Sequence, residues 1–148
     1  MAYKIEENPL PTFWAATMKM TIPEYSVDLY ERALKTLTKE LQQMGVEIQN
    51  PEYNFTMAEE KSSKIELIDV ELAVAVVNPG VDTNIIKFKQ FDEEPLMIRI
   101  KADEFMDIHT GIAEWLHDNG YEADGNLRRV LSSEDIYVYD CPYKPSED

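Results

Sequence analysis

The sequence has 148 residues, a usual size for a single domain and long enough to bury a hydrophobic core. Its 29 Asp and Glu residues against 14 Lys and Arg residues give a formal net charge of −15. This charge argues against a protein that binds nucleic-acid phosphates directly or adsorbs to an anionic membrane surface. The hydrophobic content of 44% argues against a disordered chain.

Cysteine content and hydropathy restrict the compartment and the kinds of site. Cys141 is the single cysteine, which excludes an internal disulfide and a cysteine-rich metal site and is typical of a reducing compartment. The first residues lack the apolar segment of a secretory signal, and no stretch approaches the ~18 apolar residues that a membrane span needs. We therefore expect a cytoplasmic protein with no metal and no other cofactor.

Two segments have the hydrophobic period of an α-helix. Residues 27–44 carry apolar side chains at alternating steps of three and four, and residues 103–119 present a similar apolar face. Gly45 and Gly120 follow the last turns, where a residue that tolerates positive φ can end a helix. Asp103 is the expected cap of the second helix.

Seven segments are predicted to be strands. Three long segments alternate apolar and polar residues with a period of two, which is typical of a strand with one face on a core. They are residues 12–21, 68–76 and 95–101. Shorter strands are expected near residues 53–57, 85–91, 127–131 and 136–141.

The two halves of the chain resemble each other. Residues 41–48 and 116–123 share the pattern Leu-x-x-x-Gly, an aromatic or aliphatic residue, Glu and an apolar residue. Each helix follows a long strand and precedes two more strands, so a β-α-β-β unit is used twice, as pseudo-repeats 8–78 and 84–142 of one domain. These units predict an α+β fold, an antiparallel sheet with both helices on one face and a groove where the units meet.

At these residues the sequence resembles the GyrI-like effector-binding domain, a bacterial drug-sensing module attached to some AraC- and MerR-type regulators and also found alone. The strand at residues 68–76 closes the first half as in that family. Trp115-Leu116, Asn119-Gly120-Tyr121-Glu122 and Gly125 are similar to the family's run around the second helix. The likeness spans nearly the whole chain and implies the GyrI-like, SHS2-type fold.

The sequence departs from the family where the ligand would be held. After the glycine the family usually reads Arg-Glu-x-Tyr, and the glutamate lies in the groove and receives lipophilic cations. An ungapped count places Arg129 at that glutamate, whereas a shifted register gives the role to Asp135 or Glu134. We prefer the ungapped count, which makes Arg129 an anion-accepting group, a partner for Glu71, or an exposed strand arginine.

Several residues are candidates for the wall of the ligand site. Glu71 could attract a cation or lie on the wet face of a half-buried strand. Tyr137 and Tyr139 share one face of the last strand, and their hydroxyls favour a groove wall, whereas parity favours a core position for Trp14. The predicted ligand-binding residues are Glu71, Arg129, Tyr137, Tyr139, Asp135, Phe55, Met97 and Trp14.

Three functions follow from the resemblance. The first is a stand-alone domain that sequesters or senses an amphipathic, drug-like compound between the two repeats, with a regulator as a possible partner and no direct contact with nucleic acid. The second is a protein-interaction inhibitor, because some stand-alone relatives are linked with inhibition of DNA gyrase. The third is a hydrolase of cyclopropane-bearing compounds with Glu71, Asp135 or Glu134 as its base, which we rank below binding.

Overall fold

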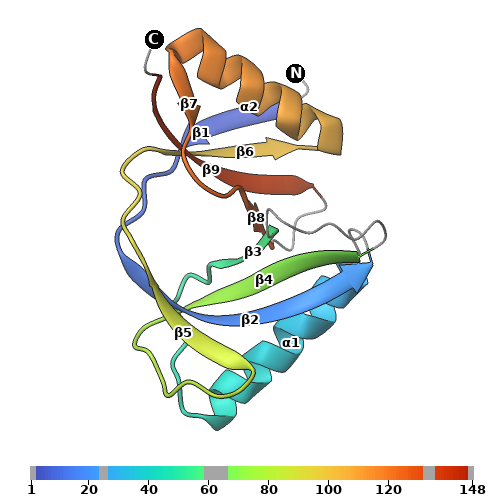
Figure 1. Cartoon of the computed structure of the whole chain (residues 1–148), viewed down its shortest axis with the longest axis vertical. Helices are drawn as coiled ribbons and strands as arrows, with labels where there is room; N and C mark the ends of the chain where they lie inside the picture. The colour runs from blue at the N-terminus through green and yellow to red at the C-terminus, as the bar shows by residue number, and fades with distance from the viewer. Residues whose placement is uncertain (1–2, 24–26, 59–66, 132–135, 147–148) are drawn as a thin grey trace. The chain divides into compact units, whose positions relative to one another are not determined.

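The structure is a computed structural model that describes residues 3–23, 27–58, 67–131 and 136–146. In these residues the chain forms two helices and nine strands (Figure 1). It divides into two compact units: unit 1 comprises Met1–Pro11 and Glu93–Asp148, and unit 2 comprises Thr12–Asp92.

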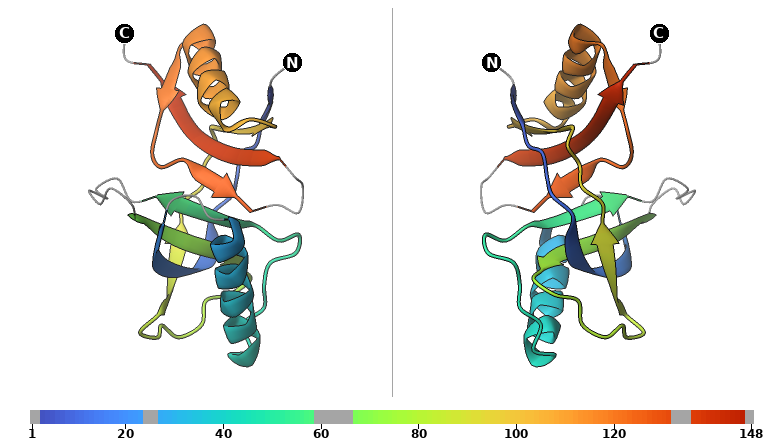
Figure 2. Two further views of the ribbon diagram at one scale, coloured as in Figure 1. Left: turned by 90° about the vertical axis from the view of Figure 1, so that its right-hand side faces the viewer. Right: turned by 90° about the vertical axis from the view of Figure 1, so that its left-hand side faces the viewer.

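Unit 2 is an antiparallel sheet with one helix against it. Its elements are β2 (Phe13–Pro23), α1 (Val27–Gln43), β3 (Asn54–Ala58), β4 (Leu67–Val76) and β5 (Ile86–Phe91). The strands lie in the order β3-β4-β2-β5, and neighbouring strands are antiparallel. Helix α1 runs along this sheet (Figures 1 and 2) and buries the side chains of Tyr30, Leu37 and Leu41.

Unit 1 has the same kind of architecture. Its elements are β1 (Tyr3–Glu7), β6 (Met97–Ala102), α2 (Phe105–Asn119), β7 (Tyr121–Ala123), β8 (Arg128–Val130) and β9 (Tyr137–Pro145). The strands lie in the order β1-β6-β9-β8, and β7 pairs with β9. Side chains of α2 and the sheet form the core, among them Ile98, Ile100, Ile108, Leu116 and Tyr139.

The predicted fold class is confirmed: the protein is α+β, its strands pair antiparallel, and each helix lies in a β-α-β-β order. Gly45 and Gly120 have φ values of 74° and 73°, so both end their helices as expected. The expected cap at Asp103 is wrong. Helix α2 begins at Phe105, and its N-cap residue is Glu104, whose side chain makes no capping hydrogen bond.

Strand β4 is buried on both faces, although alternation predicted one wet face. Every residue from Val70 to Val76 is buried, including Glu71. Ala73 lies opposite Phe55 of β3 and opposite Thr17 of β2. Small alanine side chains on β4 leave room for the larger aromatic side chains of the neighbouring strands.

Within the described part of the chain, neither helix combines the length and the hydropathy that crossing a bilayer would require.

Candidate ligand pocket

A pocket of about 420 Å³ lies in unit 2, where β2 pairs with β4 on one side and with β5 on the other. Thr17 lies opposite Lys87 in the β2–β5 pair, and Lys19 lies opposite Glu71 in the β2–β4 pair. Side chains two residues apart on a strand point to the same face, so these residues share one side of the sheet. We call this site the lysine pocket. It is lined by Thr17, Lys19, Glu71, Asn84, Ile85, Lys87 and Lys89.

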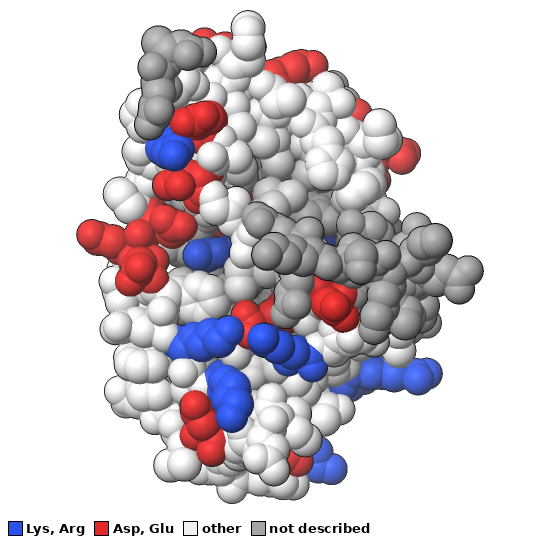
Figure 3. Space-filling view, viewed as in Figure 1, with Lys and Arg blue, Asp and Glu red and all other residues white. Residues whose placement is uncertain are grey.

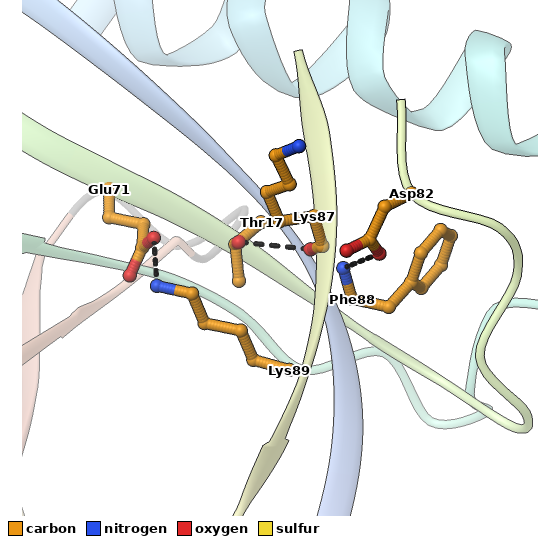
Figure 4. Close-up of polar contacts among 6 residues, drawn as sticks. All are labelled: Thr17, Glu71, Asp82, Lys87, Phe88 and Lys89. Carbon is orange, nitrogen blue, oxygen red and sulfur yellow. Dashed lines mark hydrogen bonds and ion pairs between the residues drawn. The ribbon is translucent and has the colours of Figure 1, made fainter. Parts of the chain in front are cut away.

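Glu71 is the buried acid of the lysine pocket. The residue is 8% exposed, and its Oε2 accepts a hydrogen bond from Lys89 Nζ at 2.6 Å (Figure 4). The side chain of Lys89 is 44% exposed, so this ammonium group also faces solvent. A buried carboxylate needs such a partner, because an unpaired charge at this depth is costly.

Among the described residues that line the pocket, lysines outnumber carboxylates. Within the described residues, Lys87 and Lys89 against Glu71 leave one positive charge in excess, in a chain whose net charge is −15. Figure 3 shows basic side chains gathered over the part of unit 2 that holds β2 and β5. Within the described residues, the exposed Lys87 ammonium makes no ion pair with a carboxylate.

The loop before β5 gives the pocket an apolar rim. Thr83 Oγ1 accepts hydrogen bonds from the backbone N–H groups of Ile85 at 3.2 Å and Ile86 at 2.9 Å. Asp82 Oδ1 accepts one from the N–H of Phe88 at 2.9 Å, which ties the loop to β5 (Figure 4). These bonds hold Ile85 at the pocket, where it is 67% exposed.

Thr17 connects the floor of the pocket to β5. It is 1% exposed, and its Oγ1 donates a hydrogen bond of 2.9 Å to the backbone oxygen of Lys87 (Figure 4). Because this bond joins two paired strands, it fixes the backbone that carries Lys87. The lysine pocket therefore combines a rigid floor, a cationic wall and an apolar rim.

The predicted site residues of unit 2 lie in different surroundings. Glu71 lines the lysine pocket, whereas Phe55 is fully buried in an aromatic cluster with Phe13, Tyr53 and Phe91. Trp14 is half-buried, and alternation along β2 directs it to the face opposite Thr17.

In unit 1 the structure brings two predicted site residues together. The guanidinium carbon of Arg129 lies 5.5 Å from the ring centre of Tyr137, within the range of a cation–π contact. Tyr139 is buried in the core beside Ile100, and Met97 is 1% exposed. Asp135 lies outside the described residues, as does its alternative Glu134.

The sequence reasoning did not identify the buried arginine of β8 or the acid beside it. Arg128 is 5% exposed and lies opposite Asp140 of β9, which is fully buried. Asp140 accepts two hydrogen bonds from Arg99. Arg128 forms an ion pair with Glu94, with 3.8 Å between Nη2 and Oε2. In the sequence, Arg99 alternates with aliphatic residues of β6, and this pattern predicted a polar position there. It did not identify Asp140 as the partner of Arg99.

The lysines of the pocket were also missed. Lys87 and Lys89 alternate with apolar residues on a predicted strand, and this signal indicates two cations on one face. The pairing of that strand with β2, which adds Lys19, is not readable from the sequence. Among the described residues, no three His, Cys, Asp or Glu side chains lie close enough together to hold a metal ion.

Comparisons with known proteins find likeness in structure. No family model and no curated protein matches the chain. The cryo-EM structure of the EcmrR–DNA complex in EcmrR-RPo matches 98% of this chain with a TM-score of 0.80 and 18% identity, and the match spans 59% of the EcmrR chain. The crystal structure of the EcmrR C-terminal domain matches with a TM-score of 0.77 and 18% identity, over 98% of this chain and 99% of that chain.

A hydrolase from Listeria innocua is a more distant match, with a TM-score of 0.59 and 12% identity over 95% of this chain and 92% of that chain. At these identities the comparisons show the fold. They support the GyrI-like fold that the sequence resemblance implied, and membership of a particular family stays a prediction.

Proposed function

We propose that the chain is a small-molecule-binding domain that holds an amphipathic ligand in the lysine pocket. The pocket itself carries this proposal: about 420 Å³ of space is lined by a buried carboxylate, three lysines and the exposed Ile85. Ligand sites of roughly 300–1,000 Å³ commonly combine apolar surface with a few polar groups that orient the ligand. The groove expected between the repeats stays a separate prediction.

A regulatory role extends this proposal by analogy of fold. EcmrR, whose C-terminal domain is similar to this chain, has been solved in a complex with DNA. We propose that this domain signals ligand binding to a partner protein, and that the partner is a transcription regulator. The net charge of −15 favours such a partner over direct contact with DNA.

The gyrase-inhibitor and hydrolase hypotheses stay predictions. The Listeria innocua hydrolase is similar in fold, and fold by itself does not carry chemistry. Glu71, one of the acids considered as a base, is engaged by Lys89 at 2.6 Å. Ligand binding is therefore the function that the pocket geometry supports best.

A thermal-shift screen tests the proposed function. Lipophilic cations, anions and neutral compounds are added separately, and the melting temperature is recorded. A compound at about 100 times its Kd should add about 2.7 kcal/mol to the free energy of unfolding and raise the melting temperature by about 5–10 °C.

The control is a double variant of exposed pocket residues, Ile85→Ser with Lys87→Glu, which should retain the fold and lose most of the shift. The proposal fails if the natural protein unfolds cooperatively and no compound shifts its melting temperature. It also fails if the double variant shows the full shift, because the ligand then binds outside the lysine pocket.

A further inference from the structure

We propose that the lysine pocket selects ligands with an anionic head group, such as a carboxylate, attached to an apolar body. This inference rests on the proposed function and adds the sign of the ligand's charge. It reverses the cation preference of the family that the sequence resembles, and it does so through lysines of unit 2 and not through Arg129.

The described lining residues of the pocket carry more positive than negative charge. Among the described lining residues, Lys87 and Lys89 outnumber the carboxylate of Glu71. The chain as a whole carries −15 and repels an anion at a distance. Binding of an anion here would therefore depend on short-range contacts with these ammonium groups.

A ligand that enters the pocket meets the Glu71 carboxylate together with its lysine partner. Glu71 is 8% exposed and already accepts a hydrogen bond from Lys89 at 2.6 Å. A cationic ligand that reached this carboxylate would lie beside the Lys89 ammonium group, and the two like charges would repel each other. An anionic ligand meets no such repulsion from Lys89, because an ammonium has three donors and Glu71 engages one of them.

Lys87 differs from Lys89 in its ion pairing. Its side chain is exposed, and within the described residues its ammonium makes no ion pair with a carboxylate. Thr17 Oγ1 donates a hydrogen bond of 2.9 Å to the backbone oxygen of Lys87, so the backbone from which this side chain extends is fixed. Lys87 is thus available as the residue that a carboxylate or phosphate would pair with directly.

Ile85 forms the apolar rim of the pocket. Ile85 is 67% exposed and lines the same pocket as the lysines. The methylene stems of lysines also offer apolar surface while their charged ends face water. An anion with an aromatic or aliphatic body would cover Ile85 and place its head group among the ammonium groups.

The test uses probes that share one naphthalene ring and differ in the head group. Naphthylacetate, naphthylacetamide and naphthylethylammonium have the same two-carbon chain and carry a negative, neutral and positive group. Naphthyl phosphate is added to separate a carboxylate preference from a phosphate preference. Affinity and stoichiometry are measured by calorimetric titration of the full chain.

We expect one anion per chain, with affinity in the order anion, amide, ammonium. Lys87→Gln should weaken naphthylacetate binding about fivefold, the size of a charge contact at about 4 Å near water. Lys87→Arg should retain it. Lys39→Gln removes the same charge from an exposed position on α1 and should leave the affinity unchanged.

The Glu71→Gln variant distinguishes most sharply between a pocket that binds anions and one that binds cations. If the pocket receives anions, this variant raises the affinity for naphthylacetate, because Lys89 is released from its carboxylate. If Glu71 is a cation receptor, the variant instead abolishes binding of naphthylethylammonium. Should Glu71→Gln fail to fold, the Lys87 and Lys39 variants still decide the question.

The outcomes separate this inference from the proposed function. Tighter binding of the ammonium probe than of both anions overturns anion selection and leaves ligand binding intact. Equal losses in Lys87→Gln and Lys39→Gln overturn it too, since the effect is then one of net charge. If none of the four probes binds while compounds of the thermal-shift screen do, only the inference fails; if nothing binds, both fail.

Discussion

Arg99 holds the buried carboxylate of Asp140 through two parallel hydrogen bonds, from Nε to Oδ1 at 2.7 Å and from Nη2 to Oδ2 at 2.9 Å. Asp140 is fully buried, and β9 lies between β6 and β8. Arg99 and Arg128 therefore stand opposite Asp140 on the two neighbouring strands. Paired geometry of this kind compensates a charge that water cannot reach.

We expect Asp140→Ala to lower the free energy of unfolding by about 3–5 kcal/mol, because it leaves the largely buried guanidinium of Arg99 without the carboxylate that accepts its two hydrogen bonds. Urea unfolding followed by circular dichroism measures this loss. The matched control is Glu122→Ala, which breaks the exposed pair of Glu122 and Lys144 at 3.8 Å and should cost less than about 1 kcal/mol. Equal costs for the two variants would show that Asp140 contributes no more than a surface charge.

The aromatic cluster of unit 2 gives a second prediction. Phe55 is fully buried, with its ring centre 4.8 Å from Tyr53 and 5.5 Å from Phe91. Phe55→Ala should lower the free energy of unfolding by about 3–5 kcal/mol, since it opens a cavity among these rings. Met106→Ala, at a position that is 70% exposed, is the control and should change stability little.

This variant also separates two roles of Phe55. A core residue loses stability on truncation whether or not a ligand is added, whereas a residue of a ligand wall loses affinity with little loss of stability. A Phe55→Ala protein as stable as the natural one, but deficient in ligand binding, would contradict the core assignment.

Helices and long strands could be predicted because their signals are local. The apolar period of three and four residues identified α1, and the positive φ of Gly45 ends it as glycine allows. β1 and β7 went unrecognised, because neither contains a buried residue and so neither carries a run of core side chains that would mark a strand.

The site could be predicted only in part, because it depends on pairing between distant segments. Glu71 was identified from its place among aliphatic residues of β4. Its partner Lys89 is 18 residues further along the chain and reaches it across β2. Which strands are neighbours is decided by tertiary packing, so the lysine pocket was not visible in any single segment.

Gly111 provides a third prediction, at a position where helix propensity and packing oppose each other. A Cβ atom on Gly111 would lie 2.5 Å from Ile100 Cδ1 and 2.9 Å from the ring of Tyr3. Alanine favours a helix over glycine by about 1 kcal/mol, but overpacking costs about 1–3 kcal/mol. We expect Gly111→Ala to lower the free energy of unfolding, as measured by urea titration.

Two further variants test the cause of that loss. Ala113→Gly, at an exposed position of α2, measures propensity alone and should destabilise the protein by about 1 kcal/mol. Adding Ile100→Val to Gly111→Ala removes the methyl group that clashes, so the double variant should lose less than the sum of the single losses. Stabilisation by Gly111→Ala would contradict the close approach of α2 to β6 and β1.

Burial of Cys141 in unit 1 makes the free energy of unfolding depend on pH. Burial, and then the neighbouring Asp140 carboxylate, raises the pKa of the Cys141 thiol from 9.0 to about 11. The folded state therefore favours the neutral thiol, and the unfolded chain ionises at lower pH. The contribution of the neutral thiol to the free energy of unfolding is fully present below pH 9.0. It is lost as the pH rises towards about 11.

We expect the free energy of unfolding to fall by about 2 kcal/mol more between pH 8 and pH 10.5 in the natural protein than in a Cys141→Ala variant, since each pKa unit corresponds to about 1.4 kcal/mol and most of the change falls in this window. Urea titrations of both proteins between pH 8 and pH 10.5 measure the difference, with tyrosine and lysine ionisation common to both. Alkylation by iodoacetamide at pH 8 should be about 100-fold slower in the folded protein than in urea, because the thiolate is the reactive form. Equal pH slopes for the two proteins, together with rapid alkylation of the folded one, would show that the thiol is accessible and ionises as it does in the unfolded chain.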